Sequence, residues 1–351
     1  MDAAVKKGIV LMNLGSPDST EVKDVARYLK QFLMDGRVID YPYLFRTLLV
    51  KGIIVPFRAP KSAKAYQTIW TKEGSPLVVF TKQLQRVLQQ QVAEPVEIAM
   101  RYGNPSPADA FNNLLKRNPA LEEVIALPLY PHYAMSSYET AIVYAKEIHE
   151  QNKYPFKLSF IKPFFNEENY LHAMAANMQP YLKQDHDHIL FSYHGIPERH
   201  IRKSDTTGCH CLATDNNCCD MPSPAHSTCY RHQVFETTKR LAAQLNIPKD
   251  KYSISFQSRL GKGWLQPFTD IRLEQMPGEG IKKLLIICPA FVSDCLETLE
   301  EIEERGKETF MYAGGESFTM IPCLNTHPAW VQTIAGWVKD YKDGNSNMIL
   351  V

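Results

Sequence analysis

The chain has 351 residues, with 39 lysines and arginines against 38 aspartates and glutamates, so its formal net charge is +1. This balance argues against a nucleic-acid-binding protein, which normally carries a basic excess. An apolar fraction of 44% and a charged fraction of 22% exclude a disordered or fibrous chain.

Short apolar runs recur along the chain, and longer segments with helical spacing lie between them. The expected strands are residues 8–14, 96–101, 123–129, 157–161, 188–193, 252–257, 283–288 and 317–321. The expected helices are residues 20–34, 81–92, 138–152, 170–183, 230–245, 294–305 and 328–343. Near-continuous apolar strands that alternate with helices indicate parallel sheets covered on both faces.

The eight expected strands divide into four plus four, and the pattern restarts near His188. The length also favours two domains, at about 100–200 residues per domain. We therefore predict two doubly wound α/β domains, residues 1–165 and residues 166–325. Residues 326–351 are expected to form a C-terminal helix that packs back on the first domain.

The chain shows neither a membrane span nor a signal peptide. It has no run of about 18 uncharged apolar residues. The apolar run from Ile9 is interrupted by Asn13 and is too short for the apolar region of a signal peptide. We therefore expect a cytoplasmic protein.

Polar and aromatic residues collect directly after the expected strands, where open α/β sheets bind their ligands. His194 is one of them, and Gly195 allows the sharp turn that would expose its imidazole. An imidazole can accept a proton or bind a metal near neutral pH. The alternative is a histidine that only caps a loop. Because G-x-G-x-x-G, Walker A and G-x-S-x-G sequences are all absent, dehydrogenases, phosphate-loop ATPases and α/β hydrolases are disfavoured.

A dense acidic segment begins at Asp294 and is expected to start a helix, with Ser293 or Asp294 as its N-cap. In an α-helix, Glu297, Glu301 and Glu304 would share one face at i, i+4 and i+7. Such a row is usually a solvated face. If it points inward, it provides a path for protons or a hydrated cation.

Six ordered motifs resemble those of ferrochelatases. They are Asn-Leu-Gly-Ser-Pro at 13–17, Arg-Tyr-Gly-Asn-Pro at 101–105, Leu-Pro-Leu-Tyr-Pro at 127–131, Ser-Tyr-His-Gly-Ile-Pro-Glu-Arg at 192–199, Gln-Ser-Arg-Leu-Gly at 257–261 with Trp264, and Phe-Val-Ser-Asp-Cys-Leu-Glu-Thr-Leu at 291–299. The matches run in order from Ile9 to about Pro328, which is nearly the whole chain.

This resemblance implies a lyase that inserts Fe(II) into protoporphyrin IX, releases two protons and forms protohaem, the last step of haem biosynthesis. It also implies two similar Rossmann-like, chelatase-type domains with the active-site cleft between them. The family's essential histidine and glutamate correspond to His194 and Glu297, which we expect to act in catalysis and to bind the substrate iron. Glu301 and Glu304 are expected to form the proton or metal path. The expected porphyrin contacts are Asn13, Leu14, Arg58, Tyr66, Arg101, Tyr102, Tyr130, Ser258, Trp264 and Phe291.

The chain departs from the family pattern at two positions. Many relatives have a second histidine where this chain has Cys295, which puts a two-histidine mechanism in doubt. Arg305 occupies the place of an acid two turns beyond Glu297, so the acidic row is shorter or is displaced to Glu304.

Five of the eight cysteines lie within residues 209–229, in a polar segment (203–229) that resembles an insertion. Clustered cysteines in a reducing compartment indicate a metal before a disulfide. Some bacterial ferrochelatases carry a [2Fe–2S] cluster on such an internal segment, which implies a cluster here, with zinc or no metal as alternatives. We expect the ligands to be Cys211, Cys218, Cys219 and Cys229, with Cys209 as the spare thiol.

Residues 41–60 are rich in apolar and aromatic side chains and form either a buried helix with a loop or an exposed apolar lip. The resemblance implies a lip that touches a membrane surface and admits porphyrin. We expect a monomer. Two other functions stay open: a chelatase for coproporphyrin or for cobalt, and a non-enzymatic tetrapyrrole or iron–sulfur sensor on the same fold.

Overall fold

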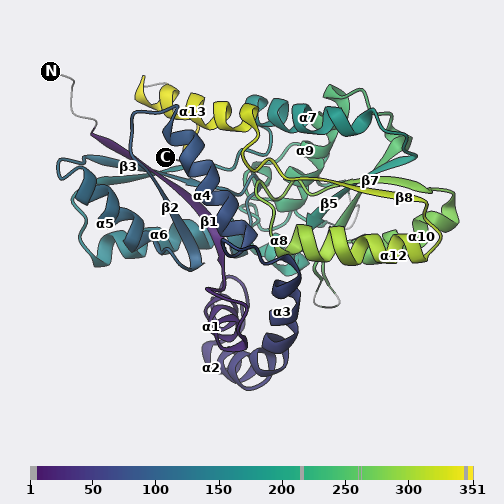
Figure 1. Cartoon of the computed structure of the whole chain (residues 1–351), viewed down its shortest axis with the longest axis horizontal. Coiled ribbons are helices and arrows are strands. Elements are labelled where there is room, and N and C mark those ends of the chain that lie inside the picture. The colour runs from purple at the N-terminus through teal and green to yellow at the C-terminus, as the bar shows by residue number, and fades with distance from the viewer. Residues whose placement is uncertain (1–5, 214–216, 260, 262, 344–346, 351) are drawn as a thin grey trace. The chain divides into compact units, whose positions relative to one another are not determined.

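The computed structural model describes residues 6–213, 217–259, 261, 263–343 and 347–350. Its strands, drawn as arrows in Figure 1, are β1 (Lys7–Ser16), β2 (Val96–Gly103), β3 (Glu123–Pro128), β4 (Lys157–Ile161), β5 (His188–His194), β6 (Tyr252–Gln257), β7 (Lys283–Ile287), β8 (Ser317–Ile321) and β9 (Ile349–Leu350). The eight expected strands are all present, with bounds within two residues of those expected.

Helices follow the strands. The α-helices are α1 (Val22–Leu33), α2 (Tyr43–Thr47), α3 (Val55–Ile69), α4 (Pro76–Gln89), α5 (Pro107–Arg117), α6 (Thr140–Gln151), α7 (Glu168–Leu182), α8 (Glu198–Lys203), α9 (Tyr230–Gln244), α10 (Thr269–Gln275), α11 (Leu296–Thr298), α12 (Lys307–Tyr312) and α13 (Pro328–Lys342). The π-helices are η1 (Leu48–Ile54), η2 (Met135–Glu139) and η6 (Leu299–Gly306). The 3₁₀-helices are η3 (Pro224–Ser227), η4 (Lys249–Lys251) and η5 (Met276–Glu279).

The chain divides into two compact units. The first comprises residues 1–129, 135–162 and 331–351, and the second comprises residues 130–134 and 163–330. The expected domain boundary lies at 165–166, three residues beyond this division. In α13, Tyr341 donates a hydrogen bond to Glu123, and Lys342 Nζ lies 3.5 Å from Glu94 Oε1, so this part of α13 packs on the first unit.

Each unit is built on its own sheet, and the two sheets repeat one strand order. The first sheet has the order β2-β1-β3-β4-β9, and the second has the order β6-β5-β7-β8. All neighbouring pairs are parallel except β9, which pairs antiparallel with β4 at Phe160 and Ile161. The expectation of four strands per sheet is therefore wrong for the first unit, where β9 covers an edge that would otherwise expose unpaired backbone groups.

Close backbone contact between β1 and β2 places the ends of both strands together. Gly15 lies opposite Tyr102 in the register, and Ser16 lies opposite Gly103. Gly15 has a φ of +104°, and a Cβ atom there would lie 1.7 Å from the Tyr102 carbonyl oxygen. A side chain at this position would therefore force the strands apart.

Two helices differ from expectation for reasons that lie in the local sequence. Helix α4 begins at Pro76 rather than at residue 81, because Ser75 has extended dihedral angles and proline is favoured in the first helical turn. Helix α5 was not predicted. Its signal is a capping box in which Ser106 and Asp109 bond to each other's backbone N–H groups.

Segment 41–60 forms α2, η1 and the first turns of α3 (Figure 1). Helices α1 and α3 pack against each other. The exposed apolar side chains of this segment, here called the lip, are Tyr41, Tyr43, Leu44, Phe45, Leu48, Ile53 and Phe57. Of the two alternatives for this segment, the exposure of these side chains favours an exposed apolar segment over a buried helix, although Val50 is buried.

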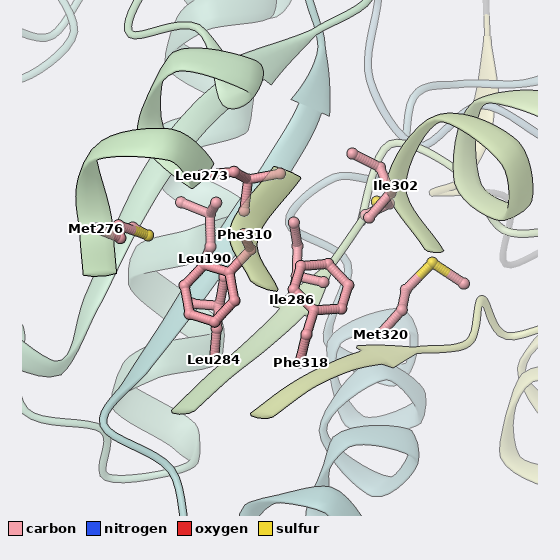
Figure 2. Packing of buried hydrophobic residues seen from close by; sticks show 10 residues of the cluster. Leu190, Leu273, Met276, Leu284, Ile286, Ile302, Phe310, Phe318 and Met320 are labelled. Atoms are coloured by element: carbon pink, nitrogen blue, oxygen red, sulfur yellow. The ribbon is translucent and has the colours of Figure 1, made fainter. Parts of the chain in front are cut away.

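One face of the second sheet packs into a hydrophobic core, and the π-helix η6, which carries Glu301, packs against this core. Figure 2 shows this cluster, which takes side chains from β5, β7, β8, α10, η5, η6 and α12. Ile302 of η6 is 1% exposed and lies in this cluster with Phe310 and Phe318. Ile302 directly follows Glu301, so the burial of Ile302 fixes the backbone position from which the Glu301 side chain extends.

Candidate active site

His194 is the last residue of β5, and hydrogen bonds fix both the C=O and the N–H of the peptide between His194 and Gly195. Gly195 N–H donates to the Gln257 carbonyl oxygen at 2.8 Å, and Tyr230 OH donates to the His194 carbonyl oxygen at 2.8 Å. His194 Nδ1 lies 2.6 Å from the Gly195 carbonyl oxygen. Since a carbonyl oxygen only accepts, the neutral ring carries its proton on Nδ1 and has its lone pair on Nε2. This tautomer can accept a proton or bind a metal through Nε2.

Phe291 lies beside this imidazole, with the ring centroids 6.3 Å apart in an edge-on arrangement. Phe291 lies between β7 and the acidic helix, and both Phe291 and His194 are half-buried. An aromatic ring and a proton acceptor therefore meet at the carboxyl end of the second sheet.

The acidic segment is not a continuous α-helix. Glu297 lies in the short α11, and residues 299–306 form the π-helix η6, whose hydrogen bonds run from i to i+5. The α-helical spacing expected for Glu297, Glu301 and Glu304 is therefore wrong. Glu301 is half-buried and Glu304 is exposed.

Residues five apart become neighbours in a π-helix, and this explains the place of Arg305. Its Nε and Nη2 atoms donate to the two carboxylate oxygens of Glu300, at 2.7 and 2.9 Å. Arg305 therefore neutralises Glu300 on the outer part of the helix.

Glu301 is bound by Ser258, directly after β6. The Ser258 N–H donates to Oε1 at 2.8 Å and the Ser258 hydroxyl donates to Oε2 at 2.5 Å. Burial raises the pKa of Glu301, and the charge of Glu297 also raises it. Both Ser258 bonds and the charge of His194 oppose the shift, but the net pKa is raised. The charges of both His194 and Glu297 therefore act on the Glu301 carboxylate.

Gln257 connects these elements, although the sequence reasoning did not single it out as a site residue. Its Nε2 donates to the Glu297 carbonyl oxygen at 2.7 Å, and its Oε1 accepts from the Ser192 hydroxyl at 2.7 Å. Gln257 also lies opposite His194 in the register of β5 and β6. Its position at the end of a strand is the signal that could have identified it.

Cys295 is a buried thiol that hydrogen-bonds to Glu297. Burial and the charge of Glu297 raise its pKa well above the usual range, so it stays a neutral donor. Asp294 lies beside it and accepts from Asn325 Nδ2 at 2.6 Å and from the Thr298 hydroxyl at 3.0 Å. The start of the acidic segment is therefore fixed by a buried polar network.

The other predicted porphyrin contacts of the second unit are Tyr130 and Trp264. Tyr130 is buried. Trp264 is half-buried and forms an isolated antiparallel bridge with Pro197, three residues after His194.

In the first unit, Asn13 and Leu14 lie near the end of β1. Asn13 is buried, and its side chain donates to Thr81 Oγ1 at 3.1 Å and accepts from the Leu14 N–H at 2.9 Å. Arg58 and Tyr66 lie on α3, where Arg58 is half-buried and Tyr66 is buried.

Arg101 and Tyr102 are bound to Asp35, which the sequence reasoning did not single out. Arg101 Nη2 and Tyr102 OH donate to Asp35 Oδ2 at 2.5 and 2.9 Å, and the Thr140 hydroxyl donates to the same oxygen. Burial would raise the pKa of Asp35, but these bonds, the Arg37 N–H and the charge of Arg101 lower it overall. Apart from the Arg37 N–H, the side-chain partners of Asp35 lie 66 to 105 residues away in sequence, so the sequence around Asp35 does not reveal them.

The cysteine segment separates its thiols by burial. Cys211, Cys218, Cys219 and Cys229 are buried, whereas Cys209 is exposed. Hydrogen bonds link Cys229 to Cys219 and to Cys211. The bond from Cys219 lowers the pKa of Cys229 to about 6, whereas the bond to Cys229 raises the pKa of Cys219, and burial raises that of Cys211. Residues 214–216 of the expected insertion lie outside the described residues.

In the described part of the chain, no three histidine, cysteine, aspartate or glutamate groups are arranged to hold a single metal ion. Nor is any described helix both long enough and apolar enough to cross a membrane.

Known proteins match nearly the whole chain. The family model described as Ferrochelatase matches residues 6–342. The ferrochelatase of Opitutus terrae is 50% identical over 95% of this chain and 97% of its own length. The ferrochelatase of Stutzerimonas stutzeri is 46% identical over 94% of this chain and 96% of its own length.

Solved structures agree at the level of the fold. SirB from Bacillus subtilis with Fe3+ has a TM-score of 0.54 at 12% identity and covers 98% of this chain and 100% of its own. The sirohydrochlorin chelatase SirB from Bacillus subtilis subspecies spizizenii, in complex with cobalt, has a TM-score of 0.55 at 10% identity and covers 99% and 100%. The family model and the two relatives cover nearly the whole sequence, and the chain therefore belongs to the ferrochelatase family.

Proposed function

We propose that this protein inserts Fe(II) into protoporphyrin IX and releases the two pyrrole protons. The observation that carries the proposal is the grouping of His194, Phe291 and the Glu297–Glu301 pair at the carboxyl end of one sheet. Metal insertion must remove two protons and bend a flat macrocycle. A neutral imidazole and adjacent carboxylates can accept the protons, and a rigid aromatic ring can hold the macrocycle bent.

His194 and Glu297 bind the substrate iron and accept the protons in this proposal. His194 presents the lone pair of Nε2, because its Nδ1–H is engaged by a carbonyl oxygen. Fe(II) accepts imidazole and carboxylate ligands. Glu301 takes protons onward, since its raised pKa lets it hold a proton closer to neutral pH than an ordinary glutamate. Glu304 is exposed and is proposed as the outer end of this path.

The porphyrin contacts are proposals carried by the family resemblance and by position. Trp264 forms a bridge with Pro197, and the ring of Phe291 lies edge-on to that of His194. Both aromatic residues are half-buried, which supports contact with the macrocycle. The remaining proposed contacts are Asn13, Leu14, Arg58, Tyr66, Arg101, Tyr102, Tyr130 and Ser258. The phenol of Tyr102 and the guanidinium of Arg101 are engaged by Asp35, so Asp35 orients both groups.

We also propose that the protein is a cytoplasmic monomer that contacts the inner membrane surface peripherally. The exposed side chains of the lip support the membrane contact. Leu44 is 77% exposed, Phe57 is 74% exposed and Leu48 is 73% exposed. The exposed Lys51 lies among them, as does the half-buried Arg58. Apolar side chains with interspersed cations are typical of segments that lie in the headgroup region of a bilayer.

A [2Fe–2S] cluster on Cys211, Cys218, Cys219 and Cys229 is the proposed resident cofactor. The burial of these four thiols and the hydrogen bonds among Cys211, Cys219 and Cys229 fit four-cysteine ligation, and exposed Cys209 stays free. The four cysteines would hold such a cluster with two thiolates for each iron, so three protein donors around one ion are not required. When bound, it supplies one-electron redox chemistry and ties the segment together.

The test is anaerobic mixing of the purified protein with Fe(II) and protoporphyrin IX, followed by the loss of porphyrin fluorescence. His194→Ala is expected to reduce turnover by about 10²–10⁴-fold, because it removes the proton acceptor. His172→Ala is the control, because His172 is exposed on α7. Equal rates for H194A and wild type would contradict the assigned role of His194.

Parallel assays with coproporphyrin and with cobalt separate the alternatives. Faster insertion into coproporphyrin than into protoporphyrin would contradict the proposed substrate while leaving iron insertion intact. Porphyrin binding without turnover for every metal and ring would favour a sensor.

A further inference from the structure

Arg231 contacts the sulfur atoms of two adjacent cysteines of the proposed cluster. It lies on α9, and its Nη1 is 3.5 Å from Cys219 Sγ and 3.7 Å from Cys218 Sγ. The ring of Phe235, one turn further along α9, lies 4.9 Å from the centre of the guanidinium group. The guanidinium is half-buried between the ring and the sulfurs, and arginine stays charged in proteins. Two sulfurs therefore face a permanent cation.

The backbone of the Cys218-Cys219 dipeptide is held separately, by three imidazoles. The Cys218 carbonyl oxygen accepts from His210 Nε2 at 2.7 Å and from His226 Nε2 at 3.0 Å. The Cys219 carbonyl oxygen accepts from His232 Nδ1 at 2.8 Å. These bonds use carbonyl groups and leave the sulfurs to Arg231.

The rings of the three histidines also contact one another. The rings of His226 and His232 stack at 3.5 Å with an interplanar angle of 9°, and His210 lies edge-on to His226 at 5.3 Å. The distance between the dipeptide and Arg231 is thus set by side chains of α9, of η3 and of the loop before Cys211. This arrangement makes the Arg231 contact a fixed feature of the segment rather than a chance surface contact.

We propose that Arg231 is a positioning residue for the [2Fe–2S] cluster, which raises its reduction potential through charge-assisted N–H···S hydrogen bonds to Cys218 and Cys219. The inference rests on the cluster ligation proposed above. Reduction adds an electron to the cluster, so a fixed cation and N–H donors at its sulfurs stabilise the reduced form more than the oxidised form. Removing Arg231 must then make reduction harder.

The experiment compares Arg231→Gln, Arg231→Lys and the control Arg240→Gln, each purified anaerobically as the full chain. Arg240 lies on the same helix, is half exposed and pairs with Glu236 four residues before it. Iron and acid-labile sulfide per chain, together with the visible absorption spectrum, report whether a cluster is present. A dithionite titration in the presence of redox dyes then gives the midpoint potential.

We expect R231Q to retain the fold and to shift the reduction equilibrium about tenfold towards the oxidised form, about 59 mV for one electron. R231K keeps the charge but loses the planar pair of donors, so its potential should fall between those of R231Q and wild type. R240Q should match wild type.

Two results would overturn the inference, and they are distinguishable. A wild-type chain without iron and sulfide would remove the cluster itself and with it the role of Arg231. A wild-type cluster whose potential is unchanged in R231Q would remove only the role of Arg231. If R231Q folds without a cluster, R231K decides, because a lowered potential supports the proposal and an unchanged potential contradicts it.

Discussion

Ser258 provides two hydrogen bonds to one carboxylate from a single residue, its N–H and its hydroxyl. Its φ of +62° lies in the left-handed region, which a serine seldom occupies. This conformation turns the chain directly after β6 and aims both donors at Glu301. The family resemblance implied a porphyrin contact for Ser258, and the structure adds a role in setting the protonation of Glu301.

Ser258→Ala removes the hydroxyl donor that lowers the pKa of Glu301, so that pKa should rise further. If catalysis needs ionised Glu301, the acidic limb of the profile of kcat/KM against pH moves to higher pH. Steady-state rates between pH 5 and 9 measure the shift. Ser317→Ala, at an exposed position of β8, is the control. An unchanged acidic limb in S258A would contradict the role of Glu301 as proton carrier.

At the scale of elements, Asp35 joins the loop after α1 to β2 and α6 through Arg101, Tyr102 and Thr140. The Asp35 carboxylate is 6% exposed and the Arg101 side chain is 13% exposed, so this ion pair is shielded from water. Removing one partner of such a buried ion pair lowers the stability of the fold, because the other charge is left buried without a counter-charge.

Asp35→Asn should therefore lower the free energy of unfolding by about 3 kcal/mol. Because the folded pKa of Asp35 is lowered, its stabilisation is present above the unfolded pKa and is lost as pH falls through the folded pKa. D35N should thus lose part of the acid dependence of stability below about pH 4. Urea unfolding at pH 7 and at pH 3 measures both effects. Asp185→Asn, whose side chain is 81% exposed beside Lys283, should change stability by less than about 0.5 kcal/mol.

The acidic helix shows how an element can depart from its sequence pattern. Glutamates at i, i+4 and i+7 predict an α-helical stripe. In the structure, residues 299–306 are wound as a π-helix, and Ile302 and Gly306 are buried against the sheet core. A Cβ atom at Gly306 would lie 3.1 Å from the Leu273 side chain, so packing against α10 constrains the helix there. The winding is decided by this packing, which no periodicity within the segment encodes.

At the scale of the whole molecule, seven of the twelve large apolar side chains that are exposed in the described part of the chain belong to the lip. Scattered exposed apolar residues are ordinary, but a contiguous set on one short helical segment marks an interaction surface.

The double variant Leu44→Asp with Phe57→Asp should weaken binding to vesicles that contain anionic lipid, because it places two charges where apolar side chains would enter the headgroup region. Vesicle co-sedimentation measures this, and a loss of at least about tenfold in partitioning is expected. Tyr312→Asp is the control, since Tyr312 is 97% exposed on α12 and lies outside the lip. Equal sedimentation of the lip variant and wild type would contradict the membrane contact.

The sequence by itself determined the eight parallel strands, their division into two groups of four and the motifs that identify the family. These features depend on local composition, because a buried strand needs a short apolar run and a strand-end motif is read from consecutive residues. The tertiary structure alone decided the rest. The binding of Asp35 to Arg101, the link from Gln257 to Glu297 and the addition of β9 to the first sheet join residues far apart in sequence. The π-helix η6 is wound locally, but it packs against Leu273 of α10. Such contacts follow from how elements pack, and no local pattern records them.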